Sequence, residues 1–220
     1  IYRKTDFNLK GIRIRLYLDI KIENLSKSFH FNAIHKDFYL NVESGEKIGV
    51  FGPNGSGKTT LLKIISGIMS YDKGEIRIDG QILKTDSSDV RRSTYYLGHS
   101  IGLYKNLTAK ENLIFISSIY KNEKLDINGI LKMAGLYSAT NSLIKFFSKG
   151  MLQRLKLAAC MVSKSKILLL DEPISGLDES GIKFFIELYN EWIVSKKTIL
   201  LVSHDKKWLK SNTDRIIKLN

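Results

Sequence analysis

"KIGVFGPNGSGKTT" (Lys47–Thr60) is the stretch of sequence that decides the fold. It begins with a short apolar run, KIGVF, of the kind found in buried parallel strands. A segment rich in glycine follows, and then "KTTLLKIISGIM" places apolar residues at helical spacing as far as Gly67. The stretch therefore predicts a buried strand, a glycine loop and a helix in direct succession.

The glycine loop has the spacing G-x-x-x-x-G-K-[ST], and it lies between a strand and a helix, which is the setting of a phosphate-binding loop. Glycines let backbone N–H groups turn inward around a phosphate, and the N-terminus of the helix adds a favourable dipole. The lysine would face the β- and γ-phosphates, and the hydroxyl after it would ligate Mg²⁺. The residues predicted to bind a nucleotide here are Gly52, Pro53, Asn54, Gly55, Ser56, Gly57, Lys58, Thr59 and Thr60.

Outward from the loop, strand patterns and helix patterns alternate along the chain. Residues 12–24 alternate between apolar and polar and predict one or two edge-type strands, while "KILLL" and "TILLVS" are apolar runs typical of buried strands. Such alternation predicts a parallel, twisted sheet. Between about 103 and 163 the patterns are helical, and Thr108 followed by Glu111 has capping-box spacing. We expect one α/β domain over 1–220, with a helical subdomain inserted at about 103–163.

Charged and polar residues stand at the ends of two of the apolar strands. Asp171 and Glu172 follow ILLL, where they would reach a metal shell and an attacking water, and His204 follows the run in "LLVSHD". Carboxyl ends of parallel strands meet at one sheet edge, where ligands bind. The alternative is that the acidic pair marks a strand leaving the core and that the histidine is an ordinary turn residue.

The overall composition excludes some classes of protein and suggests others. Lys and Arg number 35 against 22 Asp and Glu, a net charge of +13, but the basic residues are scattered, so no nucleic-acid partner is expected. The single cysteine, Cys160, excludes an internal disulfide, and its apolar helical pattern favours a core position. No apolar run approaches the roughly 20 residues of a membrane span, and no secretory signal is evident. We expect a soluble, cytoplasmic chain.

Taken together, the motifs and their order resemble those of the nucleotide-binding subunits of ABC transporters. After the phosphate loop come "FSKGM" (147–151), "ILLLDEP" (167–173), "SGLD" (175–178) and His204, and the resemblance spans about residues 19–219. It implies the ABC ATPase version of the P-loop NTPase fold: α/β, a mostly parallel core sheet, N-terminal antiparallel strands and a helical insertion. It also implies ATP and Mg²⁺ as cofactors, Thr59 and Asp171 as metal ligands, and Glu172 and His204 as catalytic residues.

The resemblance further implies a site shared between two subunits, a homodimer or a pair with another ABC subunit. Ser148 and Gly150 of one subunit would cap the ATP bound to the phosphate loop of the other, with Asp178 close by. Lys149 and Met151 replace a glycine and the glutamine of the usual L-S-G-G-Q of this loop, and activity is expected because Ser148 and Gly150 are retained. Two more nucleotide-site predictions follow the family pattern. Phe29 would stack on adenine, with Phe31 as the competing candidate, and His99 stands where the family places a metal-sensing glutamine.

The function implied is ATP hydrolysis that drives an integral membrane permease, with the chain held peripherally on the inner face of the cell membrane. "LGH", "GLYKNLTAKENL" and "DEPISGLD" look most like the haem-exporter-like systems of cytochrome c maturation, and a drug, lipid or polysaccharide exporter is the alternative. Two other classes compete: a soluble ABC ATPase of DNA repair or ribosomes, and a nucleotide sensor that does not hydrolyse. The presence of both Lys58 and Glu172 argues against the sensor.

Overall fold

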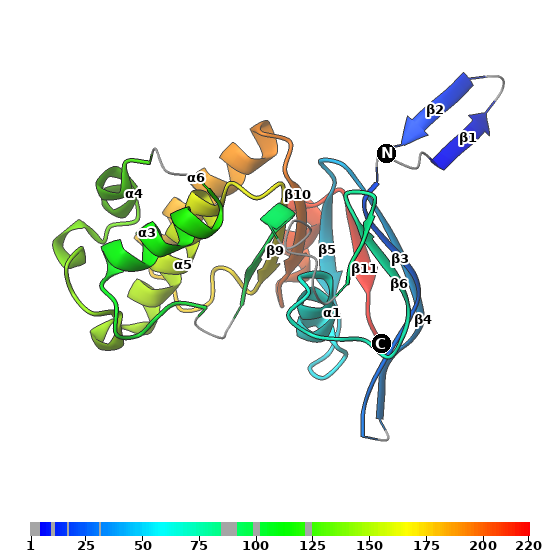
Figure 1. Ribbon diagram of the computed structural model, residues 1–220, viewed down its shortest axis with the longest axis horizontal. Coiled ribbons are helices and arrows are strands. Elements are labelled where there is room, and N and C mark those ends of the chain that lie inside the picture. The colour runs from blue at the N-terminus through cyan, green and yellow to red at the C-terminus, as the bar shows by residue number, and fades with distance from the viewer. Residues whose placement is uncertain are drawn as a thin grey trace. The chain divides into compact units, whose positions relative to one another are not determined.

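The computed structural model of this chain describes residues 5–9, 12–16, 18–30, 32–84, 92–98, 102–121 and 125–220. It contains two compact units (Figure 1). The first consists of Ile1–Tyr96, Lys166–Leu169 and Lys196–Asn220, and the second of Leu97–Ser165 and Leu170–Ser195. Within the described residues, no helix is long and apolar enough to cross a bilayer.

An antiparallel sheet forms one layer of the first unit. Its strands, in spatial order, are β4 (Asn32–Glu43), β3 (Leu18–Phe29), β6 (Lys73–Ile78) and β7 (Gln81–Ile82). β3 is hydrogen-bonded to β4 on one side and to β6 on the other, so the prediction of an edge-type strand was wrong there. The alternating pattern arises because one face of the sheet is exposed, and it does not report where a strand lies within the sheet.

A second, separate pair of antiparallel strands precedes this sheet. β1 (Thr5–Leu9), which the sequence patterns did not predict, pairs with β2 (Ile12–Leu16). The register places Phe7 opposite Ile14 and Leu9 opposite Ile12.

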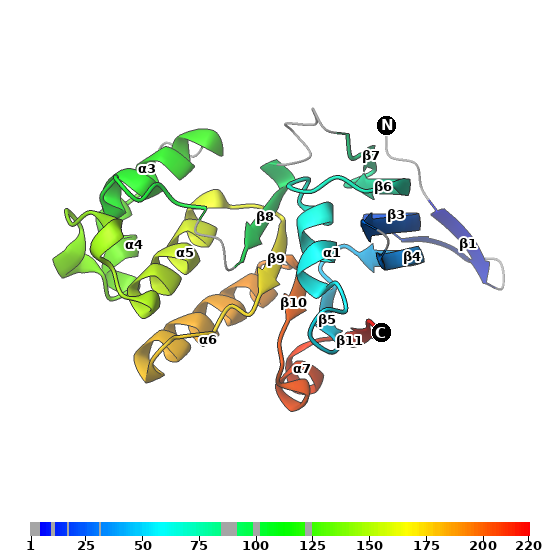
Figure 2. The ribbon, with the colours of Figure 1, turned by 90° about the horizontal axis from the view of Figure 1, so that it is seen from below.

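The five-stranded sheet carries the motifs. Its spatial order is β11 (Arg215–Lys218), β5 (Lys47–Phe51), β10 (Thr198–Val202), β9 (Ile167–Asp171) and β8 (Thr94–Leu97). β5 is parallel to both β10 and β11, and every residue of β9 and β10 is buried. This confirms the expectation of a parallel sheet built from apolar runs. In the first unit, α1 (Lys58–Ile65) packs next to β10, and α7 (Lys206–Asn212) packs on β5 and β11 (Figure 2).

The core of the first unit joins both sheets through α1. Ile20, Ile22 and Ile76 come from the antiparallel sheet, and Val50 and Leu200 come from the parallel one. All five are at most 1% exposed. The apolar residues of α1 that were predicted from helical spacing, Leu61, Leu62, Ile64 and Ile65, belong to the same cluster.

A polar network is buried at the end of the sheet where β9 and β10 begin. Asp19 is 1% exposed; one carboxylate oxygen accepts a hydrogen bond from Lys166 Nζ at 2.5 Å, and the other accepts from Thr198 Oγ1 at 2.5 Å. Thr198 Oγ1 in turn accepts from the Gly45 N–H at 2.7 Å. Lys166 also reaches Asp79 at 3.1 Å. Although burial opposes its charge, the bonds to Asp19 and Asp79 raise the pKa of Lys166.

The second unit is built from helices. They are α3 (Ala109–Ile119), α4 (Ile127–Met133), α5 (Lys149–Ser163) and α6 (Glu179–Val194), with one-turn 3-10 helices at Tyr137–Ala139 and Ile144–Phe146. α3 packs on α4 and α5, and α5 packs on α6. The predicted capping box is confirmed: the Thr108 N–H donates to Glu111 at 2.7 Å, and Thr108 Oγ1 accepts from the Glu111 N–H at 3.2 Å. Cys160 is buried in α5, as expected.

Candidate nucleotide-binding site

The glycine loop connects β5 to α1, as the sequence predicted. Gly55 and Gly57 have φ values of +85° and +88°, a conformation that side chains with a Cβ rarely adopt. At Gly52 the requirement is space, since a Cβ there would lie 2.5 Å from the Leu219 carbonyl oxygen and 2.6 Å from Ser56 Oγ. The loop is therefore curved by backbone conformation at two positions and by tight packing at a third.

Two hydrogen-bond donors lie buried beneath this loop. Lys58 is 8% exposed, and its Nζ donates to the carbonyls of Gly52 and Pro53, both at 2.8 Å. Ser56 is 7% exposed, and its Oγ has no hydrogen-bond partner among the described residues. A buried hydroxyl without a partner is costly, and a phosphate oxygen above it would supply the missing acceptor. The glycine loop, the ammonium and this hydroxyl fit a polyphosphate.

His35 supports the loop from the strand below, and the sequence analysis missed it. The ring is 5% exposed, and its Nε2 lies 3.2 Å from the Gly57 carbonyl oxygen, which also accepts from the Leu61 N–H. Since a carbonyl only accepts, the ring nitrogen that faces it carries the hydrogen. Burial lowers the pKa of His35, and the bond to Gly57 opposes that effect. A Cβ at Gly57 would lie 2.8 Å from this ring.

Phe29, the candidate for stacking on adenine, ends β3 with 42% of its surface exposed. Lys27 Nζ lies 5.2 Å from the centre of the ring and forms an ion pair with Asp72 at 3.3 Å. The Ser28 N–H donates to the same carboxylate at 2.7 Å, so the end of β3 is fixed to the segment after α1. The ring is thus accessible and held in place. Phe31, the competing candidate, lies outside the described residues.

His204 follows β10 and is exposed. Because β10 runs parallel to β5, His204 and the glycine loop leave the sheet at the same edge. Asp205, the next residue, caps α7 by accepting from the Trp208 N–H at 2.9 Å. The predicted histidine and the glycine loop therefore lie at the same edge of the parallel sheet.

The acidic pair lies at the end of β9. Asp171 is the last residue of the strand and is 2% exposed. Glu172 follows with φ +52°, the left-handed conformation, directly before Pro173. A non-glycine residue seldom adopts this conformation, and a following proline restricts its backbone further. Such strain is commonly found at functional positions.

The remaining predicted residues of the site gather around α5 in the second unit. Ser148 caps α5, its Oγ accepting from the Met151 N–H at 3.2 Å, and Lys149 beside it is exposed. Asp178 caps α6, accepting from the Gly181 N–H at 2.9 Å, and forms an ion pair with Arg154. The hydrogen bond from the Gly181 N–H, which has the larger effect, and the bond from Arg154 both lower the pKa of Asp178. His99 lies outside the described residues.

A curved glycine loop between a parallel strand and a helix, with buried donors below it, defines a P-loop nucleotide-binding domain of the α/β class. Residues 35–175 match the protein family described as "ABC transporter". The chain belongs to that family, and its domain is an ABC ATPase cassette.

Relatives and solved structures agree with this family. The chain is 34% identical over 202 residues to the uncharacterized ABC transporter ATP-binding protein YdbJ of Bacillus subtilis, covering 90% of this chain and 65% of that protein. It is 28% identical over 202 residues to the cytochrome c biogenesis ATP-binding export protein CcmA of Vibrio vulnificus, covering 91% of this chain and 98% of that protein. Among solved structures, a dimeric ATP-binding cassette bound to ADP and Pi in a post-hydrolysis state superposes with a TM-score of 0.80 at 27% identity. The match covers 91% of this chain and 94% of that one. The chain thus spans less than two thirds of YdbJ.

Proposed function

We propose that this chain is the ATP-binding and ATP-hydrolysing subunit of an ABC transporter, an exporter whose ATP-driven dimerisation moves a membrane partner. The observation that carries the proposal is the phosphate loop with Lys58 and Ser56 buried beneath it, in a chain that also has Ser148 at the start of α5 and Asp178 at the start of α6. We take 1–220 as one nucleotide-binding domain with a helical subdomain at about 103–163.

Binding of the phosphates and of adenine is assigned to the first unit. The backbone N–H groups of residues 52–60 other than Pro53, which has none, would hold the β- and γ-phosphates together with Lys58 Nζ and Ser56 Oγ. Phe29 would stack on adenine. The Thr59 hydroxyl and the Asp171 carboxylate are hard oxygen donors of the kind that Mg²⁺ prefers, so these residues would hold the ion. When bound, the ion would neutralise charge that develops on the phosphates.

Hydrolysis is assigned to Glu172 and His204. The Glu172 carboxylate would orient and polarise the attacking water, and His204 would donate a hydrogen bond to the γ-phosphate. Ser148 and Gly150 of a second subunit would complete the site, and Asp178 would lie at the same junction. The dimeric relative bound to ADP and Pi supports a shared site of this kind.

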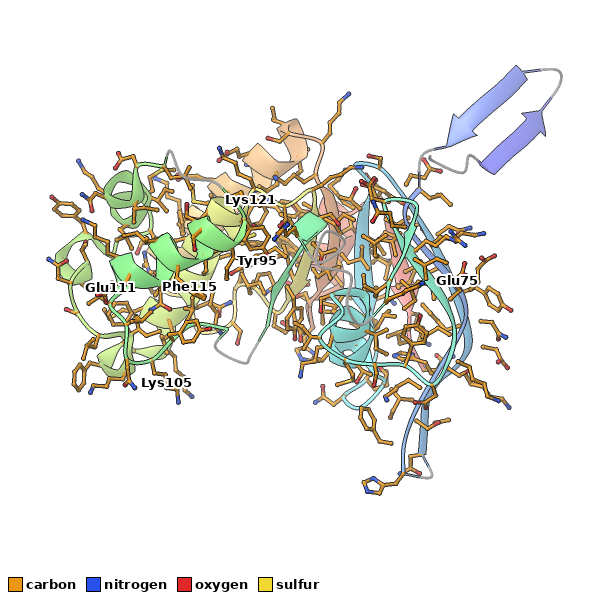
Figure 3. The ribbon with its side chains drawn as sticks, in the orientation of Figure 1. Glu75, Tyr95, Lys105, Glu111, Phe115 and Lys121 are labelled. Carbon is orange, nitrogen blue, oxygen red and sulfur yellow. The ribbon has the colours of Figure 1, made fainter. Side chains whose placement is uncertain are left out.

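Coupling to a membrane permease is assigned to the second unit, together with the stretch of sequence around His99. Tyr104, Ile114, Phe115 and Ile119 are between 39% and 55% exposed, an apolar group on and just before α3. Figure 3 labels Phe115 on this helix. The Tyr104 and Phe115 rings pack edge to face with centroids 4.8 Å apart. Exposed apolar groups of this kind mark protein interaction sites. We propose that the chain docks here on its permease, which would place it at the cytoplasmic face of the cell membrane.

The transported substrate is a finer proposal. We assign the chain to haem-exporter-like systems of cytochrome c maturation, because "LGH" (97–99), "GLYKNLTAKENL" (102–113) and "DEPISGLD" (171–178) resemble them and because CcmA is among the relatives. A drug, lipid or polysaccharide exporter is the competing assignment. Affinity purification of tagged Glu172→Gln chain from detergent-solubilised membranes, with Mg-ATP, separates the two. Cytochrome c maturation components support the first, a different permease supports the second, and ribosomes or DNA-associated proteins alone overturn the transporter proposal.

Three variants test the ATPase assignment. Lys58→Ala should weaken Mg-ATP binding in calorimetry. Glu172→Gln should bind Mg-ATP, lose hydrolysis and accumulate a dimer in light scattering. Ser148→Arg should abolish hydrolysis and leave the affinity of the monomer for nucleotide intact. Unchanged hydrolysis in Glu172→Gln removes that residue from catalysis, and a large loss of affinity in Ser148→Arg contradicts a contribution from the second subunit.

A further inference from the structure

One face of α5 lies against the loop that carries Glu172 and Asp178. Gly150, Gln153 and Arg154 occupy helix positions i, i+3 and i+4, which point to the same side. A Cβ at Gly150 would lie 3.1 Å from the Gly176 carbonyl oxygen, and Arg154 forms an ion pair with Asp178. The start of the helix is therefore held on this loop at two points by close packing and charge.

The third contact reaches the residue next to the glutamate. Gln153 is 8% exposed, and its Nε2 donates to the Pro173 carbonyl oxygen at 2.7 Å, a bond that is itself buried. Pro173 is also buried. A buried carbonyl requires a donor, and a short, buried bond of this kind restrains the peptide unit that carries the acceptor.

Glu172 stands immediately before this restrained residue and needs restraint itself. Its φ of +52° is rarely adopted by a residue with a Cβ, and the proline after it disfavours further conformations. Its carbonyl accepts from the Ser175 N–H at 3.1 Å, which closes a turn on the C-terminal side. Backbone strain of this kind persists only where surrounding contacts over-determine the conformation.

We propose that Gln153 is a positioning residue for Glu172: its hydrogen bond to Pro173 holds the backbone that aims the carboxylate. The proposal rests on the proposed function, in which Glu172 polarises the attacking water. It also gives α5 a second task. The helix whose N-terminal Ser148 would meet the nucleotide of a second subunit also sets the position of the glutamate in its own chain.

A kinetic double-mutant cycle tests this role. Gln153→Met keeps the length of the side chain and removes the donor, and Gln153→Glu keeps the shape and removes the donor at a pH where its carboxylate is ionised. Misplacement of a catalytic group by about 1 Å costs roughly 100-fold in rate, so we expect either variant to lower kcat by about 10- to 100-fold. The KM for ATP should change less than about twofold, because the phosphate loop is untouched. In a Glu172→Gln background, the same substitutions should change the residual rate by less than about twofold.

A control variant and the outcomes separate the two proposals. Ser163→Ala removes a buried hydrogen bond of 2.8 Å to the Cys160 carbonyl at the far end of α5, and it should leave kcat unchanged. Circular dichroism identifies any variant that fails to fold. If one of the two Gln153 variants does not fold, the kinetic comparison is made with the other. If Glu172→Gln loses hydrolysis while the folded Gln153 variants keep wild-type kcat, or lower it equally in both backgrounds, the positioning role is overturned alone. If Glu172→Gln keeps full activity, the catalytic assignment itself fails.

Discussion

The buried network around Asp19 allows a stability prediction whose size follows from the contacts. Asp19→Asn keeps the volume of the side chain and removes the charge that accepts from Lys166 and Thr198. Each hydrogen bond to a charged group contributes about 1.5–3 kcal/mol, and the amide oxygen of asparagine can still accept one bond. Thr198 is 0% exposed and has no access to water, whereas the Lys166 side chain is 43% exposed and does.

The estimate for Asp19→Asn is therefore a loss of about 2–4 kcal/mol in the free energy of unfolding. For a chain of this length, that corresponds to a melting temperature lower by roughly 4–16 °C. Urea unfolding followed by circular dichroism, without nucleotide, measures the loss directly, and an unchanged m-value shows that the two states being compared are the same.

A surface pair on the same strand provides the control. Lys21 and Glu23 form an ion pair at 2.9 Å with side chains 31% and 46% exposed, and Lys21→Met should cost less than about 1 kcal/mol. If Asp19→Asn is no more destabilising than Lys21→Met, the network contributes no more than a surface ion pair and the argument from burial fails.

Two further predictions concern the support of the phosphate loop. Burial lowers the pKa of His35 below its ordinary value of about 6.5, so the unfolded chain binds the proton first as pH falls through that value. The contribution of His35 to stability should thus be intact above about pH 6.5 and lost below it. In urea unfolding at several pH values, the free energy of unfolding should fall more steeply with decreasing pH in the wild type than in His35→Gln. An equal dependence on pH in the two proteins would exclude this role of His35. Gly57→Ala should weaken Mg-ATP binding and stability, because its Cβ would lie 2.5 Å from Ile34 Cγ2 at φ +88°. Gly55→Ala has the same conformational cost, but nothing lies within 4 Å of its Cβ, so calorimetry should find a smaller loss of Mg-ATP affinity than in Gly57→Ala. A smaller loss in Gly57→Ala would contradict the packing argument.

The sequence predicted those parts of the fold that local patterns determine. The glycine loop, the apolar strands β9 and β10 and the capping box at Thr108 all follow from residues close together in the chain. Their physical causes are equally local: backbone freedom of glycine, burial of a continuous apolar run and side-chain capping.

Contacts between distant residues were beyond such patterns. Asp19 and Lys166 are 147 positions apart, and Gln153 and Pro173 are 20 positions apart with a strand between them. Nothing in the surroundings of Gln153 in the sequence distinguishes it from a solvated helix residue. The position of β3 inside its sheet was missed for the same reason, because pairing partners are set by topology rather than by the pattern of one strand.

The hydrogen bonds of Lys58 to its own loop have a consequence for how nucleotide leaves. Two carbonyl oxygens of the loop hold the ammonium at 2.8 Å, and since an ammonium has three N–H donors, one is left to bind a phosphate while both loop bonds persist. When a product dissociates, the lysine would keep its two carbonyl partners, so its charge is never left without a partner in a buried position. The same two bonds hold the ammonium beneath the loop, so phosphate could bind and leave without a rearrangement of this side chain.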